Sequence, residues 1–328
     1  MKLLVLDGNS IINRAFYGIK LLTTKDGRYT NAIYGFMNIF YKLCDELHPD
    51  SVAFAFDLKA PTFRHKMYDE YKAGRKPMPP ELAEQMPVLK DLLRALGYKI
   101  VTKEGYEADD ILGTLAFSCK DGDECYIATG DRDSLQLVGD NVKVLLASTK
   151  MGRPETNIYD VKRIKDDYGV TPHQLIDIKA LMGDSSDNIP GVSGVGQKTA
   201  QSLISELGSI QNIYDNIDTI DIRETLRNKL KNDKDSAFMS YKRGEICKSV
   251  PIETDYSFYV PDEGDKGEAL SILRSLEMYK LIDKIGLNTV TYDAKPENTT
   301  VKEYKRVNSL NDFLLKANKL YFVYSVKD

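Results

Sequence analysis

The sequence predicts an α/β fold with a mostly parallel central sheet and flanking helices, followed by a helical helix-hairpin-helix subdomain. Short apolar runs of strand length alternate with segments of helical periodicity through roughly the first half of the chain. That alternation is typical of a parallel sheet covered on both faces. From residue 171 onward the periodicity is helical, and a glycine-rich turn interrupts it at residues 191–196.

The composition is that of a globular protein with a proper core. The chain has 328 residues, of which 42% are hydrophobic and 29% charged, and its net charge is −4. Any surface that binds nucleic acid must therefore be local. The four cysteines are scattered without CxxC spacing, which argues against zinc and disulfides and favours the reducing cytoplasm. The apolar run at 3–6 is too short for a signal peptide or a membrane span, and no longer one follows.

The first two predicted strands both end in an acidic residue. Residues 2–6 read as a buried strand that leads to Asp7, and residues 51–56 read as another that leads to Asp57. A helix is expected from Ile11, and a second over residues 32–47. Ligands bind beyond the carboxyl ends of parallel strands, which is where both aspartates stand.

Residues 59–80 differ in composition from the segments on either side. They hold six Lys or Arg against two acids, with aromatic residues interleaved. A helix over 62–74 would place five residues on one face, namely Arg64, Tyr68, Tyr71, Lys72 and Arg75. Such a face is common on a solvated charged helix. The alternative is a segment that contacts phosphates and stacks bases on aromatics such as Phe63.

The stretch GYEADDILGTLA at residues 105–116 places three acids before a helical pattern. A helix over 81–96 and a strand over 98–101 precede it. Taken alone, Glu107, Asp109 and Asp110 are expected to cap the helix and complement its dipole. All three can face one site only if the helix begins near Asp109.

More acids follow the next strand. Residues 125–129 form a third apolar run, and Asp131 and Asp133 come directly after it. Two residues that lie two apart in extended chain point to the same side. A further strand is expected over 142–146.

The helical half contains both acids and a phosphate-binding pattern. A helix over 175–182 leads to Asp184 and Asp187, which a helical turn would present together. Gly191, Gly194 and Gly196 then form a tight turn that lets backbone N–H groups approach an anion, ahead of Lys198 and Thr199 at a helix start. The spacing is not that of a Walker loop and favours a helix-hairpin-helix that binds a duplex backbone.

Nine acids therefore stand at strand ends and helix starts: Asp7, Asp57, Glu107, Asp109, Asp110, Asp131, Asp133, Asp184 and Asp187. If they converge, their repulsion requires cations. Carboxylates without His or Cys suit Mg²⁺, with Mn²⁺ as a substitute. Two such ions roughly 3.5–4 Å apart would clamp a phosphodiester during its displacement.

Several of these segments resemble the 5′-nuclease domain of bacterial type I DNA polymerases, within the flap-endonuclease family with its PIN-like core. The resemblance covers about residues 1–290 and rests on LDGNS at 6–10, residues 55–75, residues 105–116, TGDRDSLQL at 129–137 and residues 181–200. It implies a Mg²⁺-dependent, structure-specific 5′ nuclease that acts on DNA flaps, nicks and RNA-primer ends. No small-molecule cofactor and no membrane would be involved, and the protein would be monomeric.

The resemblance also implies a role for each residue. The first ion would be bound or oriented by Asp7, Asp57, Glu107, Asp109 and Asp110, and the second held by Asp131, Asp133, Asp184 and Asp187. Lys72 and Arg75 would contact the scissile phosphate, and Arg64 and Tyr71 would guide the 5′ strand, with Arg14 near the first strand. The hairpin from Gly191 to Lys198 would grip the duplex with a K⁺ ion.

The expected organisation has three parts. Residues 1–172 form the catalytic core with an arch at about 59–80, residues 173–290 form the helix-hairpin-helix subdomain, and residues 291–328 resemble the start of a 3′-exonuclease-like domain without its metal-binding acids. Two other functions compete with the nuclease: a non-catalytic DNA-binding module and a PIN-like ribonuclease. The full acidic set disfavours the first, and the hairpin and arch disfavour the second.

Overall fold

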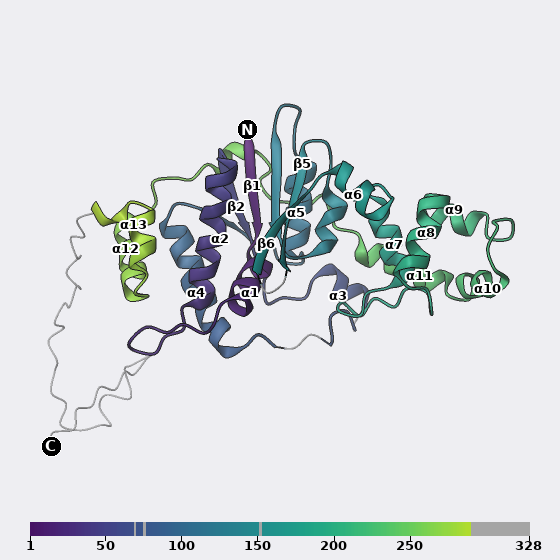
Figure 1. The fold of residues 1–328 in the computed structure, drawn as a ribbon, viewed down its shortest axis with the longest axis horizontal. Coiled ribbons are helices and arrows are strands. Elements are labelled where there is room, and N and C mark those ends of the chain that lie inside the picture. The colour runs from purple at the N-terminus through teal and green to yellow at the C-terminus, as the bar shows by residue number, and fades with distance from the viewer. Residues whose placement is uncertain (69, 75–76, 151–152, 290–328) are drawn as a thin grey trace, which may run out of the picture. The chain divides into compact units, whose positions relative to one another are not determined.

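A six-stranded sheet in the order β3-β2-β1-β4-β5-β6 organises the first half of the chain (Figure 1). The structure is a computed structural model that describes residues 1–68, 70–74, 77–150 and 153–289. Its strands are β1 (Lys2–Asp7), β2 (Ser51–Ala55), β3 (Lys99–Val101), β4 (Glu124–Thr129), β5 (Val142–Lys150) and β6 (Arg153–Tyr159). The first five run parallel and β6 pairs antiparallel with β5, so the predicted mostly parallel sheet is confirmed.

Sequence reasoning missed β6. Its sequence, RPETNIY, has no apolar run, because an edge strand needs to bury only part of its length. It extends the sheet beyond β5 and leaves the order of the four inner strands unchanged.

Helices surround the sheet and fill the second half of the chain. They are α1 (Gly8–Gly18), α2 (Asn31–Leu47), α3 (Phe63–Met67), α4 (Pro80–Ala95), α5 (Ala108–Phe117), α6 (Val161–Tyr168), α7 (Gln174–Met182), α8 (Gln197–Leu207), α9 (Ile210–Asp215), α10 (Glu224–Asn232), α11 (Lys234–Gly244), α12 (Lys266–Ser275) and α13 (Tyr279–Lys284). Three short 3₁₀ helices are η1 (Arg132–Leu137), η2 (Tyr256–Tyr259) and η3 (Leu287–Thr289). Among the residues that the structure describes, no helix has both the length and the apolarity needed to cross a membrane.

Alternate residues of β1 face two separate cores. Leu4 and Leu6 pack with α1, α2 and α4, whereas Leu3 and Val5 pack with α5 and η1 on the other face. This alternation follows from the twofold period of a strand. Because both faces are covered, only the strand ends remain open to a ligand.

The helical subdomain is smaller than the sequence predicts. Helices α7 to α11 share a third core, but α12 and α13 pack into the core of α2 and α4. The buried Tyr259 of η2 likewise joins the core under α5. The expected 173–290 subdomain is therefore wrong in its last part, because the apolar faces of α12 and α13 return to the sheet side of the molecule.

The long amphipathic helix predicted over 62–74 does not form. Helix α3 ends at Met67, where Tyr68 adopts an extended conformation (φ −159°, ψ 110°). The chain then turns through residues 70–74, and Arg75 lies outside the described residues. The four described members of the expected basic face do not share a helix, since only Arg64 among them belongs to one. The predictions for residues 291–328 also fall outside the described part of the chain.

Candidate active site

The carboxyl ends of β1, β2 and β4 meet at one edge of the sheet and bring five acids together. Asp7 ends β1, while Asp57 and Asp131 follow β2 and β4. With Glu107 and Asp109 at the start of α5 they line a cavity of about 500 Å³. We call these five residues the strand-edge cluster. Their convergence, which sequence alone could only infer, follows from the strand order β2-β1-β4.

Main-chain and hydroxyl donors fix two of these carboxylates. The Ser10 N–H donates to Asp7 Oδ1 and the Thr129 hydroxyl donates to Asp7 Oδ2, both at 2.9 Å. Asp7 thereby caps α1 while it faces the cavity. The Ala108 N–H, at the start of α5, donates to Asp57 Oδ1 at 2.7 Å. Each acid is held in one orientation before any ligand arrives.

The strand-edge cluster has a strong excess of negative charge. Burial, together with repulsion from Asp57 and Asp131, raises the pKa of Asp7 to about 7 although the hydrogen bonds from Ser10 and Thr129 lower it. Burial also raises the pKa of Asp109 well above its usual range, with repulsion from Asp7, Asp131 and Asp133 adding to the effect. Such a site is relieved by a hard cation, for which carboxylate oxygens are suitable ligands.

Lys72 supplies positive charge at the rim of this cavity. Its Nζ donates to Glu107 Oε1 at 2.8 Å, and the Tyr71 hydroxyl donates to Glu107 Oε2 at 3.2 Å. Lys72 has a left-handed backbone (φ 57°), and its N–H donates to the carbonyl oxygen of Asp187 at 3.2 Å. The turn after α3 is thus fastened between α5 and the loop that follows α7.

Asp110, which was predicted to bind or orient the first ion, does not line the cavity. Helix α5 begins at Ala108, which is late enough for Glu107 and Asp109 to face the other acids. Asp110 points the other way, is 0% exposed, and receives two hydrogen bonds of 2.8 Å from Arg64. The N–H groups of Glu107 and Cys247 also donate to it. Protein donors therefore occupy both of its oxygens.

Arg64 and Tyr71, which were expected to guide the 5′ strand, are both buried, and their DNA-guiding roles stay predictions. Arg64 is only 2% exposed, and besides Asp110 it donates to Glu107 Oε2 at 3.4 Å and to the carbonyl oxygens of Arg243 and Glu245. Tyr71 is buried against Glu107. A basic and aromatic segment thus places these two side chains in the interior, because a buried carboxylate needs a paired cation. The Arg64 guanidinium stacks on Phe63, with its Cζ atom 4.5 Å from the centroid of the Phe63 ring.

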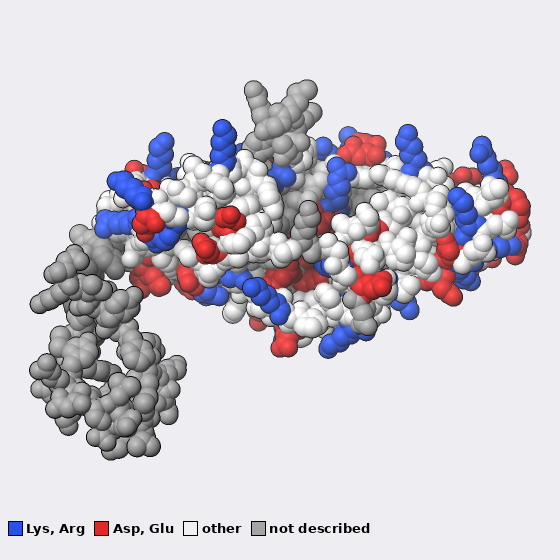
Figure 2. Space-filling model, turned by 90° about the horizontal axis from the view of Figure 1, so that it is seen from below, with Lys and Arg blue, Asp and Glu red and all other residues white. Residues whose placement is uncertain are grey.

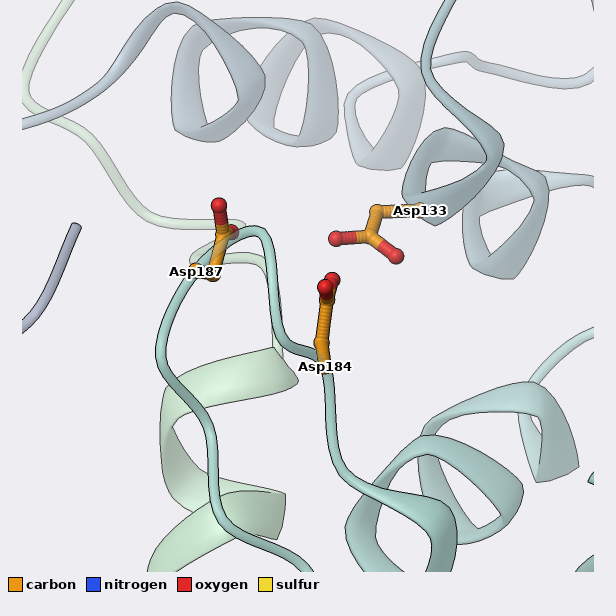
Figure 3. A group of neighbouring side chains, drawn as sticks. All are labelled: Asp133, Asp184 and Asp187. Carbon is orange, nitrogen blue, oxygen red and sulfur yellow. The ribbon is translucent and has the colours of Figure 1, made fainter. Parts of the chain in front are cut away.

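A second group of acids comes from two separate segments. Asp133 lies on η1, and Asp184 and Asp187 lie on the loop after α7, with ligand atoms all within 4.8 Å of one another. Figure 3 shows the carboxylates of Asp133 and Asp184 pointing toward each other across the gap. We call these three residues the loop cluster. A hard divalent cation fits this all-carboxylate set.

Paired glycines shape the loop that carries Asp184 and Asp187. Gly183 and Gly191 both have positive φ, and a Cβ on Gly191 would lie 2.3 Å from the Gly183 nitrogen. Between them Asp184 and Ile189 exchange two backbone hydrogen bonds of 2.8 Å. The loop closes tightly only because neither glycine has a side chain. Asp184 and Asp187 are presented by this turn rather than by a helix.

Asp131 stands between the two clusters. The resemblance placed it with the second ion, but it lines the cavity with Asp7 and acts on the pKa of Asp7 and Asp109. Its Oδ1 accepts the N–H of Asp133 at 2.9 Å, which ties it to the loop cluster. The assignment of Asp131 to the second group alone is therefore too narrow.

Sequence reasoning missed Lys179, which enters the loop cluster from α7. Its ammonium group donates to Asp133 and lies 2.8 Å from Asp184 Oδ2, although the residue is only 8% exposed. Hydrogen bonds from Lys179 and Ser186 outweigh burial and lower the pKa of Asp184 to about 2. The sequence signal for this contact was a single lysine within the apolar helix pattern at 175–182. Because a buried charge is usually paired, such a lysine indicates an acidic partner.

The glycine turn expected to bind a duplex begins α8. Gly191 and Gly194 have positive φ, and Gly196 is the N-cap. No side chain among the described residues caps this helix, so its first N–H groups stay available to an anion. Lys198 is exposed beside them and Thr199 is half-buried. Arg14 is half-buried on α1, and burial lowers its pKa.

The open edge of the sheet carries charges of both signs. Figure 2 views the molecule from the side where the parallel strands end, and acidic side chains gather near the middle of that face with lysines and arginines beside them and along the margin. The basic groups beside the acids (Figure 2) are a local feature that can attract a polyanion despite the net charge of −4.

Comparison with known proteins agrees with these observations. The family model "5'-3' exonuclease, N-terminal resolvase-like domain" matches residues 2–169, and "5'-3' exonuclease, C-terminal SAM fold" matches residues 170–266. DNA polymerase I of Caldicellulosiruptor bescii is 41% identical over 331 residues, which covers 100% of this chain and 39% of that protein. DNA polymerase I of Bacillus subtilis is 40% identical over 311 residues, covering 94% and 35%. The chain thus spans under two fifths of the length of these curated relatives.

Solved structures share the fold. The T5 D15 protein co-crystallised with metal ions superposes with a TM-score of 0.60 at 20% identity, covering 88% of this chain and 99% of that one. The catalytic core of Rad2 in complex with DNA substrate gives 0.57 at 20% identity, covering 88% and 92%. At this identity the likeness shows the fold, and the predicted α/β core with a helical second part is confirmed.

Proposed function

The chain belongs to the 5′–3′ exonuclease family, and on that premise we propose that it is a Mg²⁺-dependent, structure-specific 5′ nuclease acting on DNA. The observation that carries this proposal is the pair of neighbouring carboxylate clusters at the open edge of the sheet. Eight acids converge there without a histidine or cysteine among them, and Asp131 links the two groups. Such a donor set suits hard divalent ions, of which Mg²⁺ is the natural choice and Mn²⁺ a substitute.

Each of the two clusters would hold one ion. Asp7, Asp109 and Asp131, with Glu107 and Asp57 beside them, would hold the first, and the loop cluster would hold the second. When bound, the ions would supply the electrostatic stabilisation of an in-line hydrolysis of the phosphodiester. The fixed donors to Asp7 and Asp57 keep those carboxylates from rotating away, so the site is arranged before the substrate binds.

The chain's own basic groups would bind the DNA. Lys72 lies at the cavity rim, where its ammonium can reach a phosphate that enters the cluster, and Arg75 would follow it along the same segment. At the other end, the free N–H groups at the start of α8 and the exposed Lys198 would hold the duplex backbone. A K⁺ ion at the Gly191–Gly196 turn is part of this proposal.

The substrates would be 5′ flaps, nicks and RNA-primer ends. Since the relatives named above are more than twice as long, the chain would correspond to the first part of such a polymerase. A monomeric state and a cytoplasmic location complete the proposal. These finer statements rest on family membership and on the position of the clusters beside a duplex-binding turn.

A double-flap DNA with a labelled 5′ strand tests the proposal. We expect cleavage near the base of the flap in Mg²⁺ and none in EDTA, with binding retained when Ca²⁺ replaces Mg²⁺. A DNA-binding module would bind without cutting in either condition. Excess single-stranded RNA should compete poorly, and strong competition with RNA cleavage would favour a ribonuclease instead.

A further inference from the structure

Lys179 occupies the loop cluster, and the proposed reaction has no use for it there. Its ammonium group bridges Asp133, from the sheet side, and Asp184, from the loop after α7. The aliphatic stem packs over Gly244 of α11, where a Cβ would lie 3.4 Å from Lys179 Cδ. The side chain is therefore held between two acids that come from different parts of the chain.

The two clusters differ in how far a lysine reaches into them. Lys72 pairs with Glu107 at the rim, where a carboxylate of the strand-edge cluster is already shared with Tyr71. Lys179 lies between two of the three acids of the loop cluster. An ammonium group donates to the same carboxylate oxygens that a divalent cation needs as ligands, so the two compete directly.

We propose that Lys179 is a resident counter-cation of the loop cluster, which a divalent ion must displace in order to bind. The loop cluster then binds divalent ions more weakly than the strand-edge cluster does. This inference rests on the proposed function, since it assumes that both clusters are metal sites.

The neighbourhood provides a place for the displaced ammonium. A cavity of about 440 Å³ adjoins the cluster and is lined by Lys179 together with Tyr168, Gln197 and Gln201. We expect the displaced ammonium to rotate toward these polar groups while its stem stays on Gly244. Metal entry at the loop cluster would therefore require a side-chain rotation and no change in the backbone.

Titration of the metal-free full chain with Mn²⁺, followed by calorimetry, tests the inference. We expect wild type to bind one ion tightly and a second weakly. Lys179→Met keeps the stem and removes the charge, and it should tighten the weaker event by roughly 10- to 100-fold without changing the stronger one. Lys165→Met, which removes an exposed lysine of α6, should change neither event.

A double variant assigns the gain to this cluster. In the Asp184→Asn background, Lys179→Met should tighten the second event by a smaller factor, because one of the two contested carboxylates is gone. If Lys179→Met unfolds at the working temperature, Lys179→Gln carries the same expectation. An unchanged or weakened second event in a folded variant would overturn the inference and leave Lys179 as a structural ion pair. No Mn²⁺ binding in any of the proteins would overturn the proposed function as well.

Discussion

The strand-edge cluster and the loop cluster contain the same chemical groups in opposite electrostatic settings. In the first, burial and like charges raise the pKa of Asp7 to about 7. In the second, hydrogen bonds from Lys179 and Ser186 outweigh burial and lower the pKa of Asp184 to about 2. The carboxylates of the strand-edge cluster repel one another, and a cation can relieve that repulsion. In the loop cluster, Lys179 already neutralises part of the negative charge.

The clusters also differ in what builds them. Parallel strands β1, β2 and β4 bring the strand-edge acids to one edge, and main-chain donors orient them. The loop cluster joins η1 to a glycine-closed loop of the helical subdomain. A sheet edge fixes acid positions by its register, and a contact between subdomains leaves room for adjustment when metal or DNA binds.

Removing a central acid should have the largest effect. We expect Asp109→Asn to lower flap cleavage by roughly 10²- to 10³-fold, since preorganised charge stabilisation is lost where the phosphate reacts. Binding of the flap DNA in Ca²⁺ should stay within a few-fold of wild type. Asp140→Asn, which changes an exposed acid, is the matched control. Near-normal cleavage by Asp109→Asn would remove this residue from the site.

The buried ion pair of the neighbouring acid Asp110 should contribute chiefly to stability. Arg64→Met leaves Asp110 buried without its bidentate partner and should lower the free energy of unfolding by about 3–5 kcal/mol, measured by urea denaturation. Arg94→Met breaks an exposed pair with Asp91 and should cost at most about 1 kcal/mol. Equal costs for the two variants would mean that the Arg64 ion pair is not the buried support described above.

Repulsion in the strand-edge cluster should appear in the pH dependence of stability. A raised carboxyl pKa contributes stability that is present below about pH 4 and lost as the pH rises through about 7. In EDTA at pH 8, Asp7→Asn should therefore melt roughly 2–4 °C above wild type, and the gap should narrow at pH 5. In saturating Mg²⁺ the order should reverse, because wild type gains binding energy at the site. A constant gap across these conditions would contradict the repulsion.

The smallest effect is expected for a residue outside the two clusters. Lys198→Ala should weaken duplex binding several-fold and reduce the slope of log affinity against log salt by about one, as measured by fluorescence anisotropy. Cleavage at saturating enzyme should stay close to wild type, because neither cluster changes. A loss of cleavage without a loss of affinity would place Lys198 in the reaction itself.

The acids at strand ends were predictable because a parallel sheet leaves few choices. Asp7, Asp57 and Asp131 follow apolar runs, and the shared edge follows from topology. Asp109 and Asp110 were harder, because adjacent residues of a helix face different sides and only the start of α5 decides which one meets the cavity. The sequence pattern supports both a capping and a metal-binding role, and the structure divides these roles between the two residues.

The arch and Lys179 were not predictable from local patterns. Residues 62–74 have helical spacing, but α3 ends at Met67, and Arg64 pairs with Asp110, which lies 46 residues away in the chain. Lys179 meets Asp133 only through the docking of α7 against η1, a tertiary contact with no sequence signature. The return of α12 and α13 to the sheet side depends in the same way on which apolar face they meet.

The Arg64 contacts also constrain the order in which parts of the protein can fold during synthesis. Arg64 donates to main-chain oxygens of Arg243 and Glu245, and Asp110 accepts the N–H of Cys247, so these bonds span 137 to 181 residues. When the sheet leaves the ribosome, the helix that carries Glu107 and Asp109 still lacks these partners. The hydrogen bonds behind the nuclease centre can be completed only after residue 247 has been added, so the catalytic helix is among the last parts of the molecule to be fully supported.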